Sequence, residues 1–463
     1  MTTRARIVPI ACALLGAGCL FGLVRVLAAL GAQVPLDPNE GWNAYHAQAA
    51  MAGGPLYPDS GSFLFNNYPP LSFYVVGALG RLVGDDIVAG RIVSLLALLA
   101  IAAGLYAVSR RMNVDRRNAA FPVLFLVAGL LLFTDYVGMN DPQLLGHAVE
   151  ITALLLMMGP RRVPAVCMAA LMMVVACFIK HNLIALPLAV AVWLAIHDRR
   201  NAAWFVAAGA LFAAAGLIAF RLAYGVGLLA QLASPRVYSL ATLAQSLGFW
   251  LIWSIVPLVA AIVLFVLRRH DSNVALCGLY ACFGLIVATL FSGGAGVDAN
   301  VWFDADIALS LAAGLALEQL PHARPALIAA FAMPLAAGLS LAYDSDWLEA
   351  DFWLHPFADD IASARGDIAF LRAQNGPALC EQMSLCYWAG KRAEVDVFNL
   401  GQAYATRARN PDGLIRKVEA RYYRAVEFDS LTDFALGPAV HRAFNRFYRI
   451  DHADDNGVFL VPR

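Results

Sequence analysis

The sequence predicts a polytopic α-helical membrane protein, with about eleven transmembrane helices, that ends in a small C-terminal α/β domain. The first reason is composition, since 60% of the residues are hydrophobic and 14% are charged, whereas an average soluble domain has about 25% charged residues. The second reason is segregation. Apolar residues dominate residues 7–342 and become sparse afterwards, which indicates a membrane region followed by a water-soluble domain. The net charge is zero, so nothing indicates nucleic-acid binding.

Apolar runs of near-spanning length follow one another through the first three quarters of the chain. They cover residues 7–30, 87–109, 118–134, 144–159, 163–179, 181–196, 202–222, 246–267, 273–291, 302–320 and 325–342. The first run does not end in a small-residue cleavage site of the A-x-A type. We therefore predict a retained helix there, with a signal peptide as the alternative.

Arginine positions predict the orientation of these helices. If the N-terminus is cytoplasmic, all adjacent arginine pairs of the membrane region fall in cytoplasmic loops, and the opposite loops hold few positive charges. The pairs are Arg110–Arg111, Arg116–Arg117, Arg161–Arg162, Arg199–Arg200 and Arg268–Arg269. This is the positive-inside bias. With eleven spans it places the C-terminal domain on the periplasmic face of a bacterial inner membrane, on the same side as the long first loop.

The composition predicts two domains, a transmembrane domain at residues 1–343 with a long outer loop at 31–86, and a soluble periplasmic domain at 344–463. In the second domain, strand-like and helical patterns alternate. We expect strands at 378–380, 393–398, 423–428 and 458–461, and helices at 356–374 and 411–421. Its two cysteines, Cys380 and Cys386, form a disulfide in an oxidising compartment or remain two buried thiols.

The first outer loop carries the clearest functional signal, because a connector of more than fifty residues is far longer than two helices require. Asp37 and Glu40 are three residues apart and share one face if a helix begins there. In the alternative interpretation, Asp37 is an N-cap, Pro38 occupies the first helical position and Glu40 completes a capping box. An Asn-Tyr-Pro-Pro turn that contains Tyr68 follows.

Further ionisable residues fall on the same predicted face, where an ionisable residue at membrane depth is a functional hypothesis by default. Asp141 follows the third apolar run and either acts in the chemistry or caps the next helix. Lys180 lies at a helix end, where it either binds a phosphate as a point charge or snorkels to the interface. His147 and Glu150 are three residues apart on one helix, and we predict a hydrogen-bonded pair there rather than metal ligands.

Several common signatures are missing from the sequence. It has no P-loop, no GxSxG elbow, no HExxH pair and no CxxC pair. An ATP-driven pump is therefore not indicated. We assign no metal site and no definite cofactor, and a divalent cation is the one cofactor that we leave open.

The order of motifs in residues 30–182 resembles that of the GT-C glycosyltransferases. A first helix precedes an acidic motif in an outer loop, then a Pro-Pro-Leu turn at 69–71, and then a helix that opens VAGRIVSLLALL. That family uses polyprenyl-phosphate sugars and includes protein O-mannosyltransferases and the lipid A aminoarabinose transferase. In one departure from the family, Asn39 stands in the first position of the usual Asp-Glu motif. The resemblance therefore implies that Glu40 or Asp37 supplies the carboxylate, unless the activity has changed.

The resemblance implies an inverting glycosyl transfer, on the extracytoplasmic face, from a polyprenyl-phosphate-linked sugar to a lipid, glycan or protein acceptor. The catalytic candidates are acidic residues, the donor-phosphate candidates are basic residues, and the substrate-pocket candidates lie in the outer loops. The catalytic candidates are Glu40, Asp37 and Asp141. The donor-phosphate candidates are Lys180, His181, Arg91, Arg221 and Arg236. The pocket candidates are Asn39, Tyr45, Tyr68 and Asp298.

Two other functions remain open. A flippase or transporter for a lipid-linked sugar would account for the helices and the intramembrane charges. Transporters usually show repeated halves with a site at the midplane, and the sequence shows no internal repeat. A non-catalytic assembly partner of another transferase is the third reading, which the Asn39 departure supports.

Overall fold

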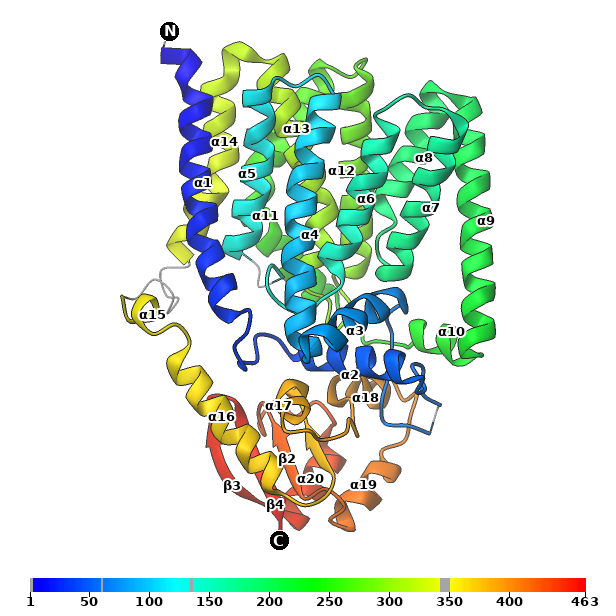
Figure 1. Ribbon diagram of the computed structural model, residues 1–463, viewed down its shortest axis with the longest axis vertical. Coiled ribbons are helices and arrows are strands. Elements are labelled where there is room, and N and C mark those ends of the chain that lie inside the picture. The colour runs from blue at the N-terminus through cyan, green and yellow to red at the C-terminus, as the bar shows by residue number, and fades with distance from the viewer. Residues whose placement is uncertain (1–2, 60, 134–135, 342–349) are drawn as a thin grey trace.

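The computed structural model describes residues 3–59, 61–133, 136–341 and 350–463. Each of the predicted apolar runs forms one helix, and these helices stand side by side in a bundle (Figure 1). They are α1 (Thr3–Ala29), α4 (Asp86–Arg111), α5 (Arg116–Phe133), α6 (Gln143–Met157), α7 (Val163–Ile179), α8 (Ala185–His197), α9 (Arg199–Tyr224), α11 (Leu240–Leu267), α12 (Ser272–Phe291), α13 (Phe303–Gln319) and α14 (Arg324–Leu341). A helix satisfies its own backbone polar groups, as a segment in lipid must.

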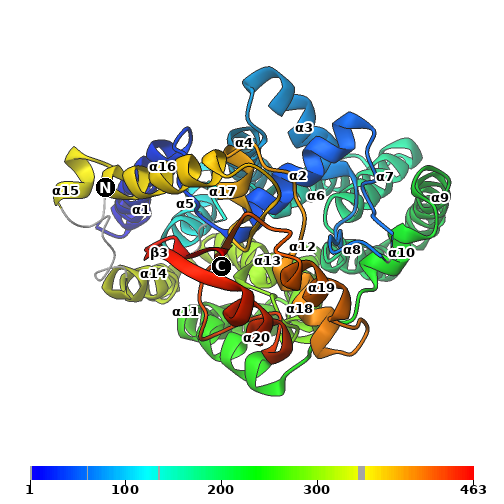
Figure 2. The same cartoon turned by 90° about the horizontal axis from the view of Figure 1, so that it is seen from below.

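Helix length and composition differ across the bundle. Among the described residues, six helices are long and apolar enough to cross a membrane, whereas α6, α7 and α8 are apolar but shorter. The number of spans therefore stays a prediction. Burial differs strongly between helices. In the segment formed by the short helix η1 (Ala299–Trp302) and α13, 94% of the most apolar stretch is buried, whereas in α9 only 11% is buried. Seen from below, α13 lies near the centre, with α1 and α9 at opposite edges (Figure 2).

The first outer loop folds into a platform of short helices beneath the bundle (Figure 1). It contains α2 (Pro38–Ala52) and α3 (Leu71–Val83), and α10 (Gly227–Leu232) lies beside it. The start of α2 follows the predicted N-cap, because the Asp37 carboxylate accepts the Asn39 N–H and Pro38 is the first helical residue. The predicted capping box does not describe Glu40, whose carboxylate accepts the Leu36 and Asn140 N–H groups and binds Arg91. Gly53 ends α2 with a φ of 68°, a left-handed conformation that glycine adopts without strain.

The C-terminal domain consists of a small mixed sheet and short helices. Its elements are α15 (Ala350–Leu354), α16 (Ala358–Ala373), β1 (Ala378–Cys380), α17 (Met383–Trp388), α18 (Val397–Ala405), α19 (Asp412–Glu419), β2 (Ala425–Phe428), α20 (Pro438–Phe447), β3 (Tyr448–Asp454) and β4 (Gly457–Pro462). The sheet order is β1-β2-β4-β3; β1 and β2 are parallel, and the other pairs are antiparallel. The predicted boundary at 343/344 lies outside the described residues.

The structure corrects one strand prediction, adds a strand that was not predicted, and decides between the two alternatives left open for the cysteines. No strand forms at 393–398, because the Asp396 carboxylate accepts the Asn399 N–H and begins α18 instead. The strand β3 was not predicted, because most of its side chains are exposed and polar and do not alternate. The predicted disulfide is present, since Cys380 and Cys386 are bonded between β1 and α17.

The C-terminal domain docks on the platform through α2 and the start of α4. Trp42 Nε1 donates to the Asp396 carboxylate at 2.9 Å, and the Tyr45 hydroxyl donates to the Lys391 carbonyl at 2.8 Å. Helices α2 and α17 approach so closely that a Cβ added to Gly41 would lie 2.2 Å from the Ser384 backbone nitrogen. The close approach therefore requires glycine at position 41, and the platform is held between the bundle and this domain.

Candidate functional site

A buried ion pair lies where the bundle meets the platform. Lys180 ends α7, and its Nζ lies 3.1 and 3.4 Å from the two carboxylate oxygens of Asp141. Both side chains are almost completely buried. Asp141 also accepts the Gln143 N–H at 2.7 Å at the start of α6, so it is both a cap and the partner of the cation. The structure thus brings together two residues that the sequence predicted for one site.

Tyr68 covers the cation of this pair. The Lys180 Nζ lies 3.9 Å from the centroid of the Tyr68 ring, a distance typical of a cation–π contact. The backbone of Tyr68 is fixed at both ends, because Asn66 accepts its N–H and the Tyr57 hydroxyl donates to its carbonyl. The edge of the Trp42 ring packs against it with centroids 5.0 Å apart. The Asn-Tyr-Pro-Pro turn therefore presents an aromatic face to Lys180.

Two more carboxylates, Asp298 and Asp37, act electrostatically on Tyr136 together with Asp141 of the pair. The Tyr136 hydroxyl donates to Asp298 at 3.3 Å. Burial, together with the nearby charges of Asp141, Asp298 and Asp37, raises the pKa of Tyr136 well above its usual value. Asp37 is half-buried beside them, and burial, reinforced by Asp141 and Glu40, raises its pKa to about 6. Asp37 thus combines partial exposure with a pKa near neutrality, the combination that a general base requires.

The other predicted cations are arranged less uniformly. Arg236 borders the site, since its charge acts on Tyr68 and on His181, and its guanidinium donates to the Ala295 carbonyl at 3.0 Å and the Asn399 side chain at 3.4 Å. His181 follows Lys180 and is exposed. The structure does not bring Arg221 into this set, because its side chain is exposed on the peripheral helix α9.

The contacts of Glu40 and Arg91 favour a structural role over the catalytic and phosphate-binding roles expected from the sequence. Both side chains are fully buried, and the Arg91 Nε and Nη2 donate to the two Glu40 oxygens at 2.7 and 2.6 Å. The Glu40 oxygens also accept the N–H groups of Leu36 and Asn140. The remaining Arg91 donors bind three backbone carbonyls, those of Ala29, Ala32 and Val34. Neither group retains a free position for a proton transfer or a phosphate, so this pair fastens the first loop to α4.

The remaining substrate-pocket candidates lie in different places. Asn39 is partly exposed next to Asp37 in the first turn of α2, and Asp298 is exposed at the start of η1. Tyr45 instead lies in the contact with the C-terminal domain described above. Sequence reasoning missed Tyr136 and Trp42. A signal for Trp42 existed, because a large aromatic residue stands in the second turn of the loop helix, two residues after Glu40.

A cavity of about 450 Å³ opens beside Asp298, between α5, α11 and α13. Aromatic side chains line much of it, including Phe125, Phe249, Trp250, Trp302 and Phe303. The indole rings of Trp250 and Trp302 stack with centroids 4.8 Å apart, and Trp250 Nε1 donates to Asp306 at 3.0 Å. The cavity thus offers a largely aromatic space that Asp298 borders.

Comparison with known proteins places this geometry in a known fold. The structure superposes on ArnT from Cupriavidus metallidurans bound to undecaprenyl phosphate, with a TM-score of 0.64, 14% identity, and coverage of 96% of this chain and 98% of that chain. It also superposes on the Archaeoglobus fulgidus oligosaccharyltransferase tethered to an acceptor peptide, with a TM-score of 0.52, 12% identity, and coverage of 98% and 74%.

Sequence comparisons are less extensive. Residues 65–252 match a family described as a 6-pyruvoyl-tetrahydropterin synthase related domain, membrane protein, which is less than half of the chain. No curated protein matches by sequence. The structural matches extend over nearly the whole chain, and both solved proteins have the GT-C fold. The chain is therefore a polytopic membrane protein with the GT-C fold.

Proposed function

We propose that this protein is an integral-membrane glycosyltransferase that moves a sugar from a polyprenyl-phosphate-linked donor to an acceptor hydroxyl or amide on the extracytoplasmic face. One observation carries the proposal, namely the buried Asp141–Lys180 pair beneath Tyr68. A buried cation held at a helix end by one carboxylate and an aromatic face is a suitable site for a phosphate anion. The fold supports the same function, since ArnT with this fold was solved with bound undecaprenyl phosphate.

The donor phosphate would approach Lys180 from the side of His181 and Arg236. Lys180 would then share its charge between Asp141 and the phosphate, and Arg236 at the border would add a second positive charge. Such preorganised charge stabilises the phosphate most when the bond to the sugar is breaking, because negative charge accumulates there. The fixed Tyr68 ring limits where the ammonium group can move.

Asp37 is the residue that we propose as the general base. In a single displacement, the Asp37 carboxylate accepts the proton of the acceptor as the acceptor atom forms a bond to the anomeric carbon. The bond from that carbon to the phosphate oxygen breaks, and polyprenyl phosphate leaves with the electron pair. The configuration at the anomeric carbon is inverted. A pKa of about 6 keeps Asp37 mostly ionised at pH 7 while leaving it basic enough to accept a proton.

The aromatic cavity next to Asp298 is suited to an isoprenoid segment of the donor. It lies within the bundle, and its lining is mostly aromatic and aliphatic. Binding sites for apolar ligands have this character, with a few polar groups at one end that fix the orientation. With the tail in this cavity, repulsion from the Asp298 carboxylate would direct the phosphate away from that residue and toward the cations Lys180 and Arg236.

The test measures donor-lipid binding and transfer separately, with the purified full-length protein. Undecaprenyl phosphate binding is followed by tryptophan fluorescence, and transfer with a panel of polyprenyl-phosphate sugars. We expect Lys180→Ala to weaken undecaprenyl phosphate binding by about 10- to 150-fold, the value of a charged contact worth about 1.5–3 kcal/mol. The matched control is Lys417→Ala, which removes a lysine from the surface of the C-terminal domain and should change nothing.

Equal binding by the parent protein and Lys180→Ala would contradict the proposed donor site. Movement of a lipid-linked sugar across vesicles, with no transfer from any donor, would identify a flippase instead. If the protein shows no binding, no transfer and no translocation, the role of an assembly partner remains.

A further inference from the structure

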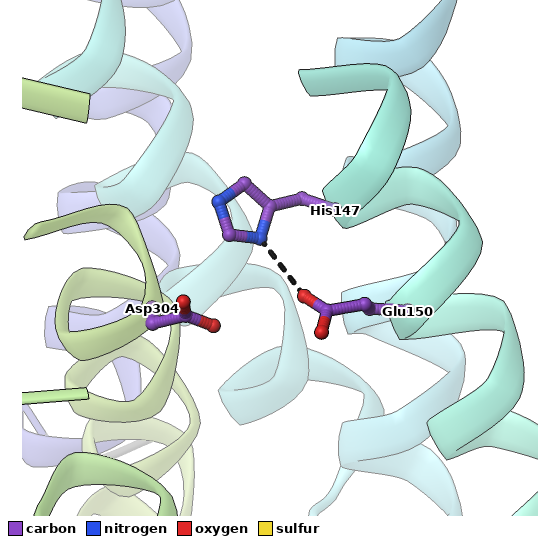
Figure 3. A group of neighbouring side chains, drawn as sticks. All are labelled: His147, Glu150 and Asp304. Atoms are coloured by element: carbon purple, nitrogen blue, oxygen red, sulfur yellow. Dashed lines mark hydrogen bonds and ion pairs between the residues drawn. The ribbon is translucent and has the colours of Figure 1, made fainter. Parts of the chain in front are cut away.

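A second polar cluster lies inside the bundle, apart from the ion pair of the candidate donor site. His147 and Glu150 project from α6 and Asp304 from α13, and the three side chains converge (Figure 3). One ligand atom from each lies within 4.8 Å of the others. The His147 Nδ1 and Glu150 Oε2 are 3.3 Å apart, so the hydrogen-bonded pair that the sequence predicted is present. The third member comes from a helix more than 150 residues away and was not predicted.

If both carboxylates of the cluster are ionised, its negative charge exceeds what the described groups around it can balance. His147 and Glu150 have no exposed surface and Asp304 is 3% exposed. Two carboxylates this close in a buried site repel each other and lose their hydration, and each effect is costly. Among the described residues, Lys180 is near enough to act on His147 electrostatically, but its ammonium group already contacts Asp141. A bound cation would relieve the repulsion.

An unused ligand atom points to the same conclusion. Glu150 Oε1 is buried and has no hydrogen-bond partner among the residues that the structure describes. A buried carboxylate oxygen without a partner costs about 1–3 kcal/mol or more, so nearly all such groups in proteins are satisfied. The other carboxylate oxygen of Glu150, Oε2, faces His147. The unpartnered Oε1 therefore belongs to a carboxylate that is already part of the cluster.

The surroundings resemble the outer shell of a metal site. Metal-bound histidines usually use one ring nitrogen as the ligand and hold the other with a hydrogen bond, and metal-bound carboxylates are hydrogen-bonded in turn. Here His147 Nε2 lies 2.9 Å from the side-chain amide nitrogen of Gln143. With Nδ1 as the ligand, Nε2 carries the ring proton, and the Gln143 amide turns over so that its oxygen accepts that proton. The Tyr280 hydroxyl donates to Asp304 Oδ1 at 2.8 Å, which leaves Oδ2 free for a ligand bond.

We propose that His147, Glu150 and Asp304 bind one divalent transition-metal ion, with Zn²⁺ as the first candidate. One imidazole and two carboxylates suit Zn²⁺ or Mn²⁺, whereas Mg²⁺ and Ca²⁺ favour sites made of oxygen ligands. Bonds of about 2.0–2.2 Å place two ligands of a tetrahedral zinc roughly 3.4 Å apart, so the side chains need only a small closure. The ion would join α6 to α13 and fix the helix that begins just after Asp141. The proposal does not depend on the transfer reaction.

The experiment measures the metal directly in the full-length protein, purified without a histidine tag and dialysed against a chelator. Calorimetric titration with Zn²⁺ should give one ion per chain, and Co²⁺ should produce the visible absorption of a tetrahedral site. We expect Glu150→Gln and Asp304→Asn each to weaken Zn²⁺ binding by at least about 100-fold, because each removes one of three ligands. Gln143→Leu, which removes the partner of His147, should weaken binding by about 10- to 100-fold.

The matched control lies in the second group of possible ligands, Asp367, His452 and Asp454, at the edge of the C-terminal sheet. There the Asp367 oxygens already contact His452 and Asn456, so we expect His452→Gln to leave the Zn²⁺ stoichiometry and affinity unchanged. Loss of binding in His452→Gln would assign the ion to that group and overturn the proposal. Unchanged affinity in Glu150→Gln and Asp304→Asn, or no binding by the parent protein, would overturn it as well.

Thermal unfolding supplies a second measurement that remains useful if a variant folds poorly. Zn²⁺ should raise the melting temperature of the parent protein with concentration, as a ligand specific for the folded state does, but not that of Glu150→Gln. If no metal binds, Glu150→Gln removes a buried charge and should leave the melting temperature equal or higher, with no response to Zn²⁺ in either protein. That result would also contradict the site.

Discussion

Trp42 on the platform and Asp396 in the C-terminal domain are joined by a buried hydrogen bond of 2.9 Å across 354 positions of sequence. The Asp396 carboxylate also accepts from the Asn399 backbone and side chain at the start of α18. One carboxylate therefore both begins a helix of the C-terminal domain and attaches that domain to α2, whose N-terminus is capped by Asp37. The position of the domain is thus coupled to the candidate site.

The first prediction concerns this attachment. Trp42→Phe keeps the aromatic packing but leaves a buried carboxylate with one donor fewer, which costs about 1–3 kcal/mol. We expect faster hydrogen exchange in α2 and α18 and greater protease sensitivity of the C-terminal domain. Trp204→Phe on the exposed side of α9 is the control. Identical exchange in Trp42→Phe and the parent protein would show that the bond does not hold the domain.

The second prediction separates the structural role of Glu40 from the chemical role that its position in the sequence indicates. Arg91→Ala leaves the Glu40 carboxylate buried without its cation, and breaking a buried pair in this way costs about 3–5 kcal/mol. We expect a large loss of folded protein for Arg91→Ala and for Glu40→Gln. Arg221→Ala, which removes an exposed arginine, should have little effect. Turnover per folded molecule of Glu40→Gln should stay near the parent value, and a selective loss of turnover would restore Glu40 as the base.

The third prediction concerns pH and Asp37, whose pKa rises from 3.8 to about 6 in the folded protein. The folded state then binds the proton more tightly than the unfolded chain, so this group stabilises the fold below about pH 4. The contribution is lost as the pH rises through about 6. Asp37→Asn keeps the N-cap, because Asn and Asp cap about equally well, and it does not titrate.

The melting temperature should therefore decrease more steeply between pH 4 and pH 6 for the parent protein than for Asp37→Asn, and the two curves should run parallel above pH 7. Parallel curves over the whole range would show that Asp37 has an ordinary pKa. In a transfer assay, the rate of the parent protein should rise with pH with a midpoint near 6, as expected for a base that must be ionised.

The fourth prediction concerns the compartment of the C-terminal domain. If that domain is periplasmic, Cys380 and Cys386 should react with a maleimide only after denaturation and reduction, because they are joined in a disulfide. Cys282, which is an exposed free cysteine on α12, serves as the internal control for labelling of the denatured chain. A reporter fused after Arg463 should be active only outside the cytoplasm. A cytoplasmic reporter, or two thiols that label without reduction, would reverse the predicted orientation.

Much of this fold was accessible from sequence because its determinants are local. Each apolar run became a helix whose ends lie within a few residues of the prediction, since length and hydrophobicity specify a membrane helix with little help from its neighbours. The start of α2 was equally readable, because Asp37 and Pro38 act on the residues beside them. The strand β3 was not, because it gains its order from pairing with β4 rather than from a pattern of its own.

The residues of the candidate site also differ in how far the local sequence predicts their contacts. The positions of Asp141 and Lys180 at the ends of predicted helices placed them on one face, and they meet. The pairing of Glu40 with Arg91 depends on how the first loop folds back across α4, a tertiary contact 51 residues apart in sequence. No local pattern reveals such a partner, and an acid that reads as catalytic in sequence can therefore be fully occupied in the structure. The same holds for Asp304, which reaches His147 and Glu150 from α13.

The shortness of α6, α7 and α8 has a consequence for the surrounding lipid. These helices have 15, 17 and 13 residues, which at about 1.5 Å per residue span roughly 20–25 Å, against about 30 Å of hydrocarbon in a typical bilayer. If these three helices span the membrane, lipids beside them must shorten or tilt their chains, and the bilayer is then locally thin. Lipid headgroups would then lie closer to Lys180, and a lipid-linked phosphate would reach Lys180 while the lipid stays in its leaflet. Acyl-chain length in reconstituted vesicles should therefore control access to the site.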